Sequence, residues 1–432
     1  MEFQTLKRSH LKRNIIIGVV CIAIISAVVL NFTRAKYRTT QSIPLVNGTI
    51  NYELSDLNLI GVYIEDGNDY TRVDQIPDSG YTFNSEKSYC KIGDEKQDMT
   101  ITYDMNAKNL TIAPMTKKGT KCYLYFDKKT TLKDTILANN SVNSGTPNFA
   151  NTATTDEGVY KTQDDWGDSY YFRGAVNNNW VKFANFYWRI IRINGDGSIR
   201  MIYQGTSANT TGTGTQLQTN AFNSSYNRSE YVGYMYTSGQ QHGNTTNSPI
   251  KTIIDNWYSS NLASYADKIS KEAGFCGDRE MASGYSWSSQ PSSTIYYAGY
   301  GRLVQNSSSV NPTFKCSNSN DLYTTSSSSK GNKKLTNPIG LITADEVIMA
   351  GGAWNSGNSS YYLYNNANYW TMSPYDFIAS SSRAYVFYVS SDGILSWHRV
   401  NSAAPGVRPV INLSADVKVT GSGTSSDPFV VS

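Results

Sequence analysis

An uninterrupted uncharged run near the N-terminus constrains this chain more than any other feature. The run extends from Ile15 to Leu30, reads IIIGVVCIAIISAVVL, and is continued by Asn31 and Phe32. As a helix, Ile15–Phe32 would be about 27 Å long, close to the thickness of the hydrocarbon core of a bilayer. Four basic residues precede the run, and an excess of positive charge marks the cytoplasmic side of such a segment. The sequence therefore predicts a single-pass anchor at residues 15–32.

A cleaved signal peptide is the alternative interpretation of the same run. The run is long for the apolar core of a signal peptide, and Thr33-Arg34-Ala35 is a poor cleavage site. We therefore favour an uncleaved signal anchor that follows a basic cytoplasmic tail at residues 1–14. The C-terminal remainder is then an ectodomain outside the cell membrane, and the membrane is a partner of the chain.

The positive charge of the chain is concentrated at the flanks of this anchor. Of the 38 Lys+Arg and 34 Asp+Glu residues, seven basic residues and one acidic residue fall within residues 1–38. This leaves 31 basic and 33 acidic residues for the remainder, so the overall net charge of +4 belongs to the flanks. An ectodomain without a basic surplus lacks the electrostatic attraction that nucleic-acid binding requires. We expect no nucleic-acid partner.

Four cysteines follow the predicted anchor, at Cys90, Cys122, Cys276 and Cys316. An even number of cysteines after an export signal is typical of a disulfide framework. Three pairings are possible, and proximity along the chain favours Cys90–Cys122 and Cys276–Cys316. Four buried thiols are the second interpretation. A zinc site ranks last, because no C-x-x-C pair or histidine cluster is present. We expect neither a metal nor another cofactor.

The ectodomain divides by its sequence pattern into four parts. Residues 33–50 are predicted as a stalk, and residues 51–127 as a small β-rich, sandwich-like domain. In that domain Lys121–Asp127 alternates with a period of two, which is the signature of a strand. Residues 128–160 are rich in Asn, Thr, Ser and Gly and predict a linker. Residues 161–432 are predicted as a larger, mostly antiparallel α+β domain.

Strand signals open and close the larger domain. Phe186–Ile193 and Ser198–Gln204 flank an Asn-Gly-Asp-Gly turn, which indicates a hairpin. Further strands are expected at Ser382–Ser390, Ile394–Val400 and Gly406–Leu413. Between them, residues 284–335 are dominated by Ser, Asn, Tyr and Gly and predict a long loop, a type of segment that often carries binding sites.

Helix signals lie between these strands. Ser248 and Pro249 match the N-cap and first position of an amphipathic helix, and Leu262–Ile269 is predicted as a second short helix. Thr343-Ala344-Asp345-Glu346 matches a capping box, in which capping and solvation explain the acidic side chains. The predicted fold class is therefore α+β, with an N-terminal transmembrane helix, a small β-sandwich-like domain and the larger α+β domain.

Several segments of the larger domain also resemble a known group of sequences. In chain order they are NFYWRIIRINGDGSIRMIY, SPIKTIIDNWYSSNL, GLITADEV, YWTMSP and GVRPVINL. This order resembles a bacterial domain family of unknown function, and the whole chain resembles uncharacterised membrane-anchored surface proteins of Gram-positive gut bacteria. More distantly, the larger domain is similar to the C-type-lectin-like fold shared with formylglycine-generating enzymes. That similarity implies a mostly antiparallel α+β scaffold with a loop-rich binding face.

Catalysis has no positive support in the sequence. His242 and His398 are the histidines that follow the anchor, and no G-x-S-x-G elbow surrounds a serine. The resemblance to formylglycine-generating enzymes does not include the cysteines that this group uses near its C-terminal end, because none follows Cys316. A pair of carboxylates for glycoside hydrolysis stays open as an alternative, because such residues need not be close in sequence. We expect a protein that is not an enzyme.

Aromatic residues gather in a segment rich in Asn, Ser and Gly between positions 354 and 397. Tyr and Trp give a large contact area at low entropic cost, and Asn and Ser give adaptable hydrogen bonds. Trp370 is predicted in the core, whereas Tyr361, Tyr362 and Tyr364 are predicted in a loop. The candidate ligand-binding residues are Trp354, Tyr361, Tyr362, Tyr364, Tyr369 and Trp397.

These features favour a membrane-anchored extracytoplasmic surface protein that binds a glycan or a protein ligand through its lectin-like domain. Carbohydrate or a cell-surface protein is the expected partner besides the membrane. One alternative is a structural cell-envelope protein without a specific ligand. The other is an extracytoplasmic enzyme distantly like formylglycine-generating enzymes.

Overall fold

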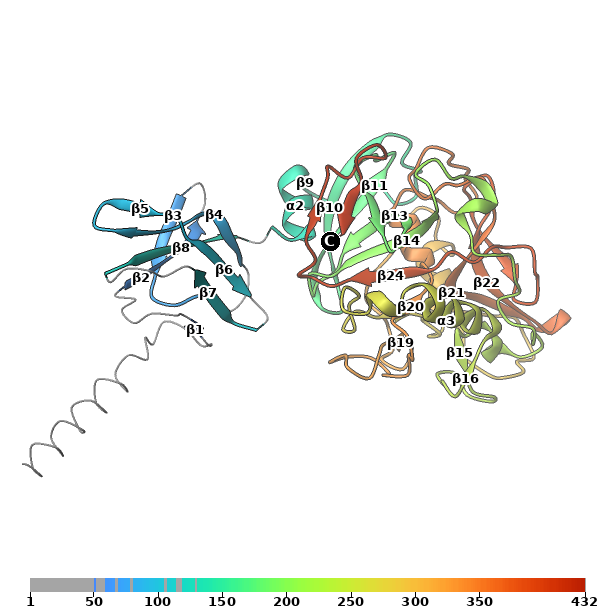
Figure 1. Ribbon diagram of the computed structural model, residues 1–432. Helices are drawn as coiled ribbons and strands as arrows, with labels where there is room; N and C mark the ends of the chain where they lie inside the picture. Colours follow the sequence, from blue (N-terminus) through green and yellow to red (C-terminus); the bar gives the residue numbers. More distant parts are fainter. Residues whose placement is uncertain are drawn as a thin grey trace, which may run out of the picture. The chain divides into compact units, whose positions relative to one another are not determined.

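The computed structural model describes residues 50–51, 59–66, 69–77, 81–104, 107–113, 119–128 and 130–431. The chain divides into two units, Met1–Lys129 and Thr130–Ser432. The secondary structure is mixed α+β, dominated by sheets with few helices (Figure 1). The predicted tail, anchor and nearly all of the stalk, residues 1–49, lie outside the described residues. In the part of the chain that is described, no helix has the length and apolar character needed to cross a bilayer.

The first unit contains two β-sheets around one hydrophobic core. The larger sheet has the strand order β3-β2-β8-β4-β5, and the smaller has the order β1-β7-β6. The strands are β1 (Ile50–Asn51), β2 (Leu59–Asp66), β3 (Asp69–Val73), β4 (Tyr81–Ile92), β5 (Glu95–Gln97), β6 (Thr100–Asp104), β7 (Asn109–Ala113) and β8 (Lys121–Lys128). Leu124 and Phe126 of β8 are buried in the same cluster as Ile101 and Ile112 of the smaller sheet. The β-rich character predicted for this part of the chain is present.

One disulfide joins the central strand of the larger sheet, β8, to its neighbour β4. Cys90 of β4 lies directly opposite Cys122 of β8, and the two are bonded. The second disulfide, Cys276–Cys316, lies in the second unit. Both predicted pairings are therefore confirmed, and a disulfide framework fits an oxidising extracellular environment.

The second unit contains a ten-stranded sheet and a separate four-stranded sheet. The first has the order β20-β24-β14-β13-β11-β10-β9. In addition, β12 pairs with β13 on one side and with β26 on the other, and β25 pairs with β26. The four-stranded sheet has the order β18-β21-β22-β23. The strands are β9 (Val142–Asn143), β10 (Asp156–Asp164), β11 (Gly167–Gly174), β12 (Trp180–Phe183), β13 (Phe186–Ile193), β14 (Ile199–Gly205), β15 (Met235–Tyr236), β16 (Thr246–Asn247), β17 (Phe275–Cys276), β18 (Ile295–Tyr296), β19 (Leu322–Tyr323), β20 (Ile339–Gly340), β21 (Tyr369–Ile378), β22 (Arg383–Val389), β23 (Leu395–Arg399), β24 (Val410–Leu413), β25 (Val419–Thr420) and β26 (Phe429–Val431). The helices are α2 (Leu132–Asn139), α3 (Pro249–Asn261), α4 (Ala298–Leu303) and α5 (Ala344–Met349).

Residues 130–160 are part of the second unit and not the predicted linker. Helix α2 begins after Thr131, whose hydroxyl caps it, and its side chains Leu132 and Ile136 are buried in the core of the unit. Strands β9 and β10 extend the ten-stranded sheet. The polar composition of residues 128–160 predicted a linker, but a few apolar side chains, such as Leu132 and Ile136, are enough to attach α2 to the core.

The predicted hairpin and the first predicted helix are confirmed. β13 and β14 pair in antiparallel fashion, with Ile193 opposite Ile199 across the turn, and both strands are buried along nearly their whole length. Helix α3 begins at Pro249 after its N-cap Ser248. The second predicted helix, Leu262–Ile269, was wrong, because this segment forms only a single 3-10 turn at Ala263–Tyr265.

Helix α5 lies between the two large sheets. Its capping box is confirmed, with the hydroxyl of Thr343 accepting from the backbone of Glu346 at 3.0 Å and the Glu346 carboxylate accepting from the backbone of Thr343 at 2.9 Å. The helix packs against β11 of the ten-stranded sheet and against β21 and β23 of the four-stranded sheet. All six of its residues are buried, so α5 helps to hold the two sheets together.

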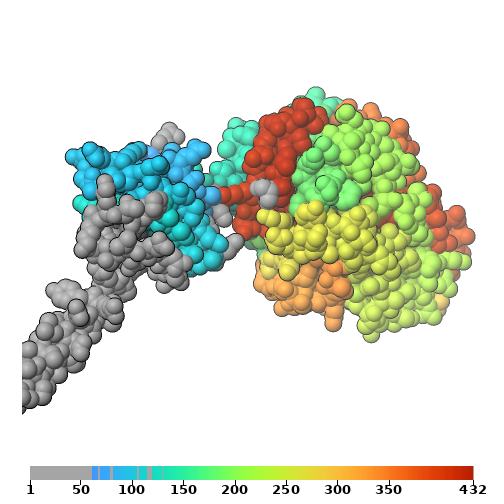
Figure 2. All heavy atoms as spheres, in the orientation of Figure 1, coloured from blue at the N-terminus to red at the C-terminus, as the bar shows by residue number. Residues whose placement is uncertain are grey.

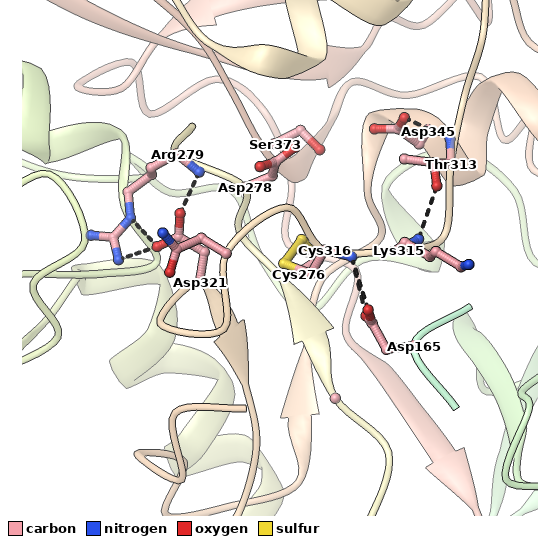
Figure 3. Close-up of a disulfide and its surroundings, with 12 residues drawn as sticks. Asp165, Cys276, Asp278, Arg279, Thr313, Lys315, Cys316, Asp321, Asp345 and Ser373 are labelled. Carbon is pink, nitrogen blue, oxygen red and sulfur yellow. Dashed lines mark hydrogen bonds and ion pairs between the residues drawn. A yellow bond between two sulfur atoms is a disulfide. The ribbon is translucent and has the colours of Figure 1, made fainter. Parts of the chain in front are cut away.

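The disulfide Cys276–Cys316 joins β17 to a loop residue 40 positions further along the chain, before α5 (Figure 3). We expect the double substitution C276S/C316S to lower the free energy of unfolding of the second unit by about 2–4 kcal/mol, since crosslinking residues 40 positions apart restricts the unfolded chain. Chemical denaturation of the full-length protein measures this change. C90S/C122S, which alters only the first unit, is the control and should leave the unfolding transition of the second unit unchanged. If the second unit of C276S/C316S unfolds at the same denaturant concentration as that of the wild type, the expectation is contradicted.

Candidate functional site

Three of the six predicted ligand-binding aromatics are core residues. Tyr361, Tyr362 and Tyr369 expose 2%, 4% and 0% of their surface. The backbone N–H of Tyr362 donates to the carbonyl of Gly174 in β11 at 3.0 Å, and the Arg189 guanidinium lies 5.4 Å from the centre of the Tyr362 ring. Tyr361 and Tyr362 lie in a loop between α5 and β21, as predicted. Their expected accessibility to a ligand was wrong, because this loop turns inward against the ten-stranded sheet. These tyrosines pack the core and do not form a ligand surface.

The other three predicted residues are at least partly accessible, and two of them lie together. Trp354 and Tyr364 are half-buried, and Trp397 in β23 exposes 40% of its surface. The ring of Tyr375 lies between the two tryptophans and stacks on both, with centroid distances of 5.5 Å to Trp354 and 5.8 Å to Trp397. The interplanar angles are 16° and 13°. We call Trp354, Tyr375 and Trp397 the aromatic column.

The register of the four-stranded sheet explains this arrangement. Trp397 of β23 lies opposite Phe387 of β22. The ring of Phe387 meets the ring of Tyr375 edge-on at 5.0 Å. The pairing of β21 with β22 shifts between Pro374 and Asp376, which places an extra residue, Tyr375, in β21. A bulge of this kind re-aims a side chain, and here it accompanies the stacking of Tyr375 in the column.

Tyrosines from the predicted loop border the column. Tyr296 of β18 and Tyr300 of α4 stack on each other at 3.9 Å and meet the ring of Tyr375 edge-on at 5.9 and 5.7 Å. Tyr285 packs against Tyr296 at 5.1 Å. All three bordering tyrosines are half-buried. Sequence reasoning missed them, although the density of tyrosine in residues 284–335 was a usable signal.

A buried carboxyl lies next to the column in β21. Asp376 is 3% exposed, and its Oδ1 has no hydrogen-bond partner among the described residues. Burial raises its pKa to about 8. After burial itself, the charge of Asp376 is the next cause that raises the pKa of Tyr296 and of Tyr375. Asp376 is therefore mostly protonated at neutral pH, and it lies opposite Tyr296 in the pairing of β18 with β21.

A second set of buried charges surrounds the capping box and is well paired. The Glu346 carboxylate accepts from Arg192 Nε at 3.2 Å and from Arg200 Nη2 at 3.2 Å. Arg192 also pairs with Asp164 at 2.7 Å. Burial alone raises the pKa of Glu346, but Arg200 and Arg192 hold that pKa below its ordinary value. The predicted solvation of Glu346 was wrong, since it is 2% exposed. The cluster has the properties of a structural ion-pair network.

His242 and Asp321 form a hydrogen-bonded pair at 2.9 Å through the imidazole Nδ1. The Nε2 atom faces Glu280 at 3.3 Å, and Asp321 also accepts from Arg279 Nε at 2.9 Å (Figure 3). The hydrogen bond to Asp321 raises the pKa of His242. A general base that activates a nucleophile has that nucleophile within hydrogen-bond reach of its free nitrogen. In this structure the carboxylate of Glu280 lies at Nε2, where a nucleophile would be needed, and it stabilises the protonated imidazole of His242. This arrangement favours a structural role for His242.

The space beside the Cys276–Cys316 disulfide is charged and small. Its cavity of about 20 Å³ has room for about one water molecule. Arg302 spans it, bonding Asp345 at 2.9 and 3.0 Å and Asp278 at 2.7 Å. Figure 3 shows both aspartates near the disulfide. Among the described residues, no group of three or more His, Cys, Asp and Glu side chains is arranged to hold a metal ion.

Comparison with known protein families, with curated proteins and with solved structures found no match. The candidate site is therefore defined by geometry: the aromatic column, the tyrosines that border it and the carboxyl of Asp376 beside it.

Proposed function

We propose that this chain is a membrane-anchored extracytoplasmic surface protein that binds a glycan or a protein ligand through the aromatic column, without catalysis. The exposure of Trp397 at the end of a stack of rings carries the proposal. Stacked aromatic rings are held in place before a ligand arrives, so little conformational entropy is lost on binding. A sugar ring or an aromatic or aliphatic side chain fits the open face of such a platform.

Two further features support the cellular setting of this proposal. The disulfides of both units are stable in an oxidising compartment and rare in the cytosol. In this proposal the uncharged run at residues 15–32 is the membrane anchor, and the four basic residues that precede it favour an orientation with the rest of the chain outside.

We also propose that the second unit belongs to the C-type-lectin-like class. Support comes from its two large sheets with few helices and from the disulfide-tethered segment that carries Tyr285, Tyr296 and Tyr300 to the column. Long loops that bring binding residues to a rigid scaffold are the general means by which such domains acquire ligands.

Trp397→Ala is expected to weaken ligand binding about tenfold or more while leaving the unfolding transition close to that of the wild type. Truncation of an exposed aromatic anchor removes contact area from the ligand, whereas the fold loses little, because the ring is not fully buried. A glycan array and a cell-binding assay on the full-length protein identify the ligand. Titration of that ligand then compares the variant with the wild type.

Tyr226→Ala is the matched control, because Tyr226 is also an aromatic residue with 39% exposure and shares no described ring contact with the column. It should bind as the wild type does. Equal affinities of W397A and the wild type would show that the column is not the binding surface. Regular self-assembly of the protein, without any ligand on the array or on cells, would instead favour a structural envelope protein.

A further inference from the structure

A groove separate from the aromatic column runs beside α3. It has a volume of about 460 Å³ and is lined by α3, by Tyr203 of β14 and by the segment 216–218. In Figure 2 the segment that includes α3 (yellow) crosses the visible face of the second unit. Small-molecule sites commonly have volumes between about 300 and 1,000 Å³. None of the residues that line the groove belongs to the column.

An aromatic ring, held by other rings, contributes to the wall of this groove. Trp257 of α3 is half-buried. Its ring contacts Phe186 at 5.3 Å, Tyr203 at 5.6 Å and Trp188 at 6.2 Å. Because three rings fix its orientation, the part of Trp257 that stays accessible presents a flat apolar surface to the groove.

Apart from the phenol of Tyr203, the polar side chains that line the groove are four amides and one serine hydroxyl. They belong to Gln216, Gln218, Asn256, Ser260 and Asn261. Gln218 and Asn256 are exposed. Gln216 is held by a bond from its Nε2 to the carbonyl of Asn368 at 2.7 Å, and Asn261 Nδ2 donates to the carbonyl of Trp257 at 2.9 Å. Each amide side chain offers both a donor and an acceptor.

The charge of the lining narrows the class of ligand. No Lys, Arg, His, Asp or Glu is among the residues that line the groove, so a phosphate, a carboxylate or an ammonium group finds no countercharge there. A pyranose ring has one apolar face and a periphery of hydroxyls that both donate and accept. That pattern matches a flat indole bordered by amides.

We propose that the groove beside α3 binds a neutral oligosaccharide. The sugar ring lies against Trp257, and its hydroxyls exchange hydrogen bonds with Asn256, Gln218 and Ser260. This site is independent of the proposed function of the column.

The test is calorimetric titration of the full-length protein with three probes: cellotetraose, maltotetraose and chitotetraose at millimolar concentration. At least one probe should bind. The double variant N256A/Q218A, which alters exposed side chains only, should weaken that binding tenfold or more. Ser260→Ala should weaken it as well, whereas Ser259→Ala, at the preceding position of the same helix and outside the groove, should not.

The proposal is overturned by no binding of any probe, by equal binding of N256A/Q218A and the wild type, or by equal losses in S259A and S260A. Loss of probe binding in W397A would also overturn it, because the sugar would then lie on the column. Retained probe binding in W397A, together with loss in N256A/Q218A, supports the groove whatever the outcome for the column.

Discussion

Replacement of Glu346 by glutamine is expected to lower the free energy of unfolding of the second unit by about 3–5 kcal/mol at neutral pH. Arg192 and Arg200 are 6% and 1% exposed. The substitution leaves the Arg200 guanidinium without the carboxylate that neutralises it, whereas Arg192 keeps Asp164 as its one carboxylate partner. Chemical denaturation of the full-length protein measures the change. Because the pKa of Glu346 is lowered in the fold, its contribution is present above the pKa of an unfolded glutamate and is lost as the pH falls. The difference between E346Q and the wild type should therefore narrow in acid.

Asp168→Asn is the control for this prediction. Asp168 also forms an ion pair, with Lys161 at 2.7 Å, but both side chains are about half exposed, at 50% and 47%. An exposed pair contributes little, so D168N should unfold with the wild-type midpoint. An E346Q protein as stable as the wild type would contradict the role assigned to the buried network.

The second large effect concerns Asp376 and pH. Its pKa is raised from 3.8 to about 8 by burial alone, so between these values the folded state holds a proton that the unfolded state releases. Stability must then fall as the pH rises across this range, by at most about 1.4 kcal/mol per pH unit. Asp376→Asn keeps the shape of the protonated acid and cannot ionise. We expect D376N to lack this loss and to be more stable than the wild type at pH 8.

Denaturation of both proteins at several pH values between 5 and 8 tests this prediction. His242 also has a raised pKa, and its contribution to stability is likewise lost as the pH rises. Since His242 is present in both proteins, the difference between them isolates Asp376. Parallel curves for D376N and the wild type would show that the carboxyl is solvated or paired in solution.

Local signals in the sequence were sufficient for several elements. The Asn-Gly-Asp-Gly turn between two apolar runs predicted β13 and β14, and Ser248-Pro249 predicted the first residue of α3. The capping box predicted α5 from four residues. Each of these features is decided by hydrogen bonds and side-chain periodicity within a dozen residues, and for that reason a single sequence is informative.

Features that depend on distant partners were not predictable in this way. Glu346 is in a capping box whether it is solvated or buried, and its partners Arg192 and Arg200 lie 154 and 146 positions away. Tyr361 and Tyr362 were expected to be accessible because their neighbours in the loop are Asn, Ser and Gly. Both are buried, because the loop packs against β11, where the Gly174 carbonyl accepts from the Tyr362 N–H.

The candidate site was predicted in part. Trp354 and Trp397 were expected to contact a ligand and lie in one column, but Tyr375, which joins them, was not among the predicted residues. Its position depends on a bulge in the pairing of β21 with β22, and a bulge leaves little trace in one sequence. Aromatic density thus located the right region of the chain, and strand register determined which rings meet.

The bridge between Thr131 and Lys418, with the bond from the Leu132 N–H to the Val417 carbonyl at 3.0 Å, joins the first turn of α2 to the chain just before β25. Two positions almost 290 residues apart along the sequence are therefore neighbours in space. Domains whose chain termini are adjacent tolerate circular permutation and insertion into a host protein. The second unit could accordingly be grafted into a loop of a carrier protein through two short joints, which would display the aromatic column on a new scaffold.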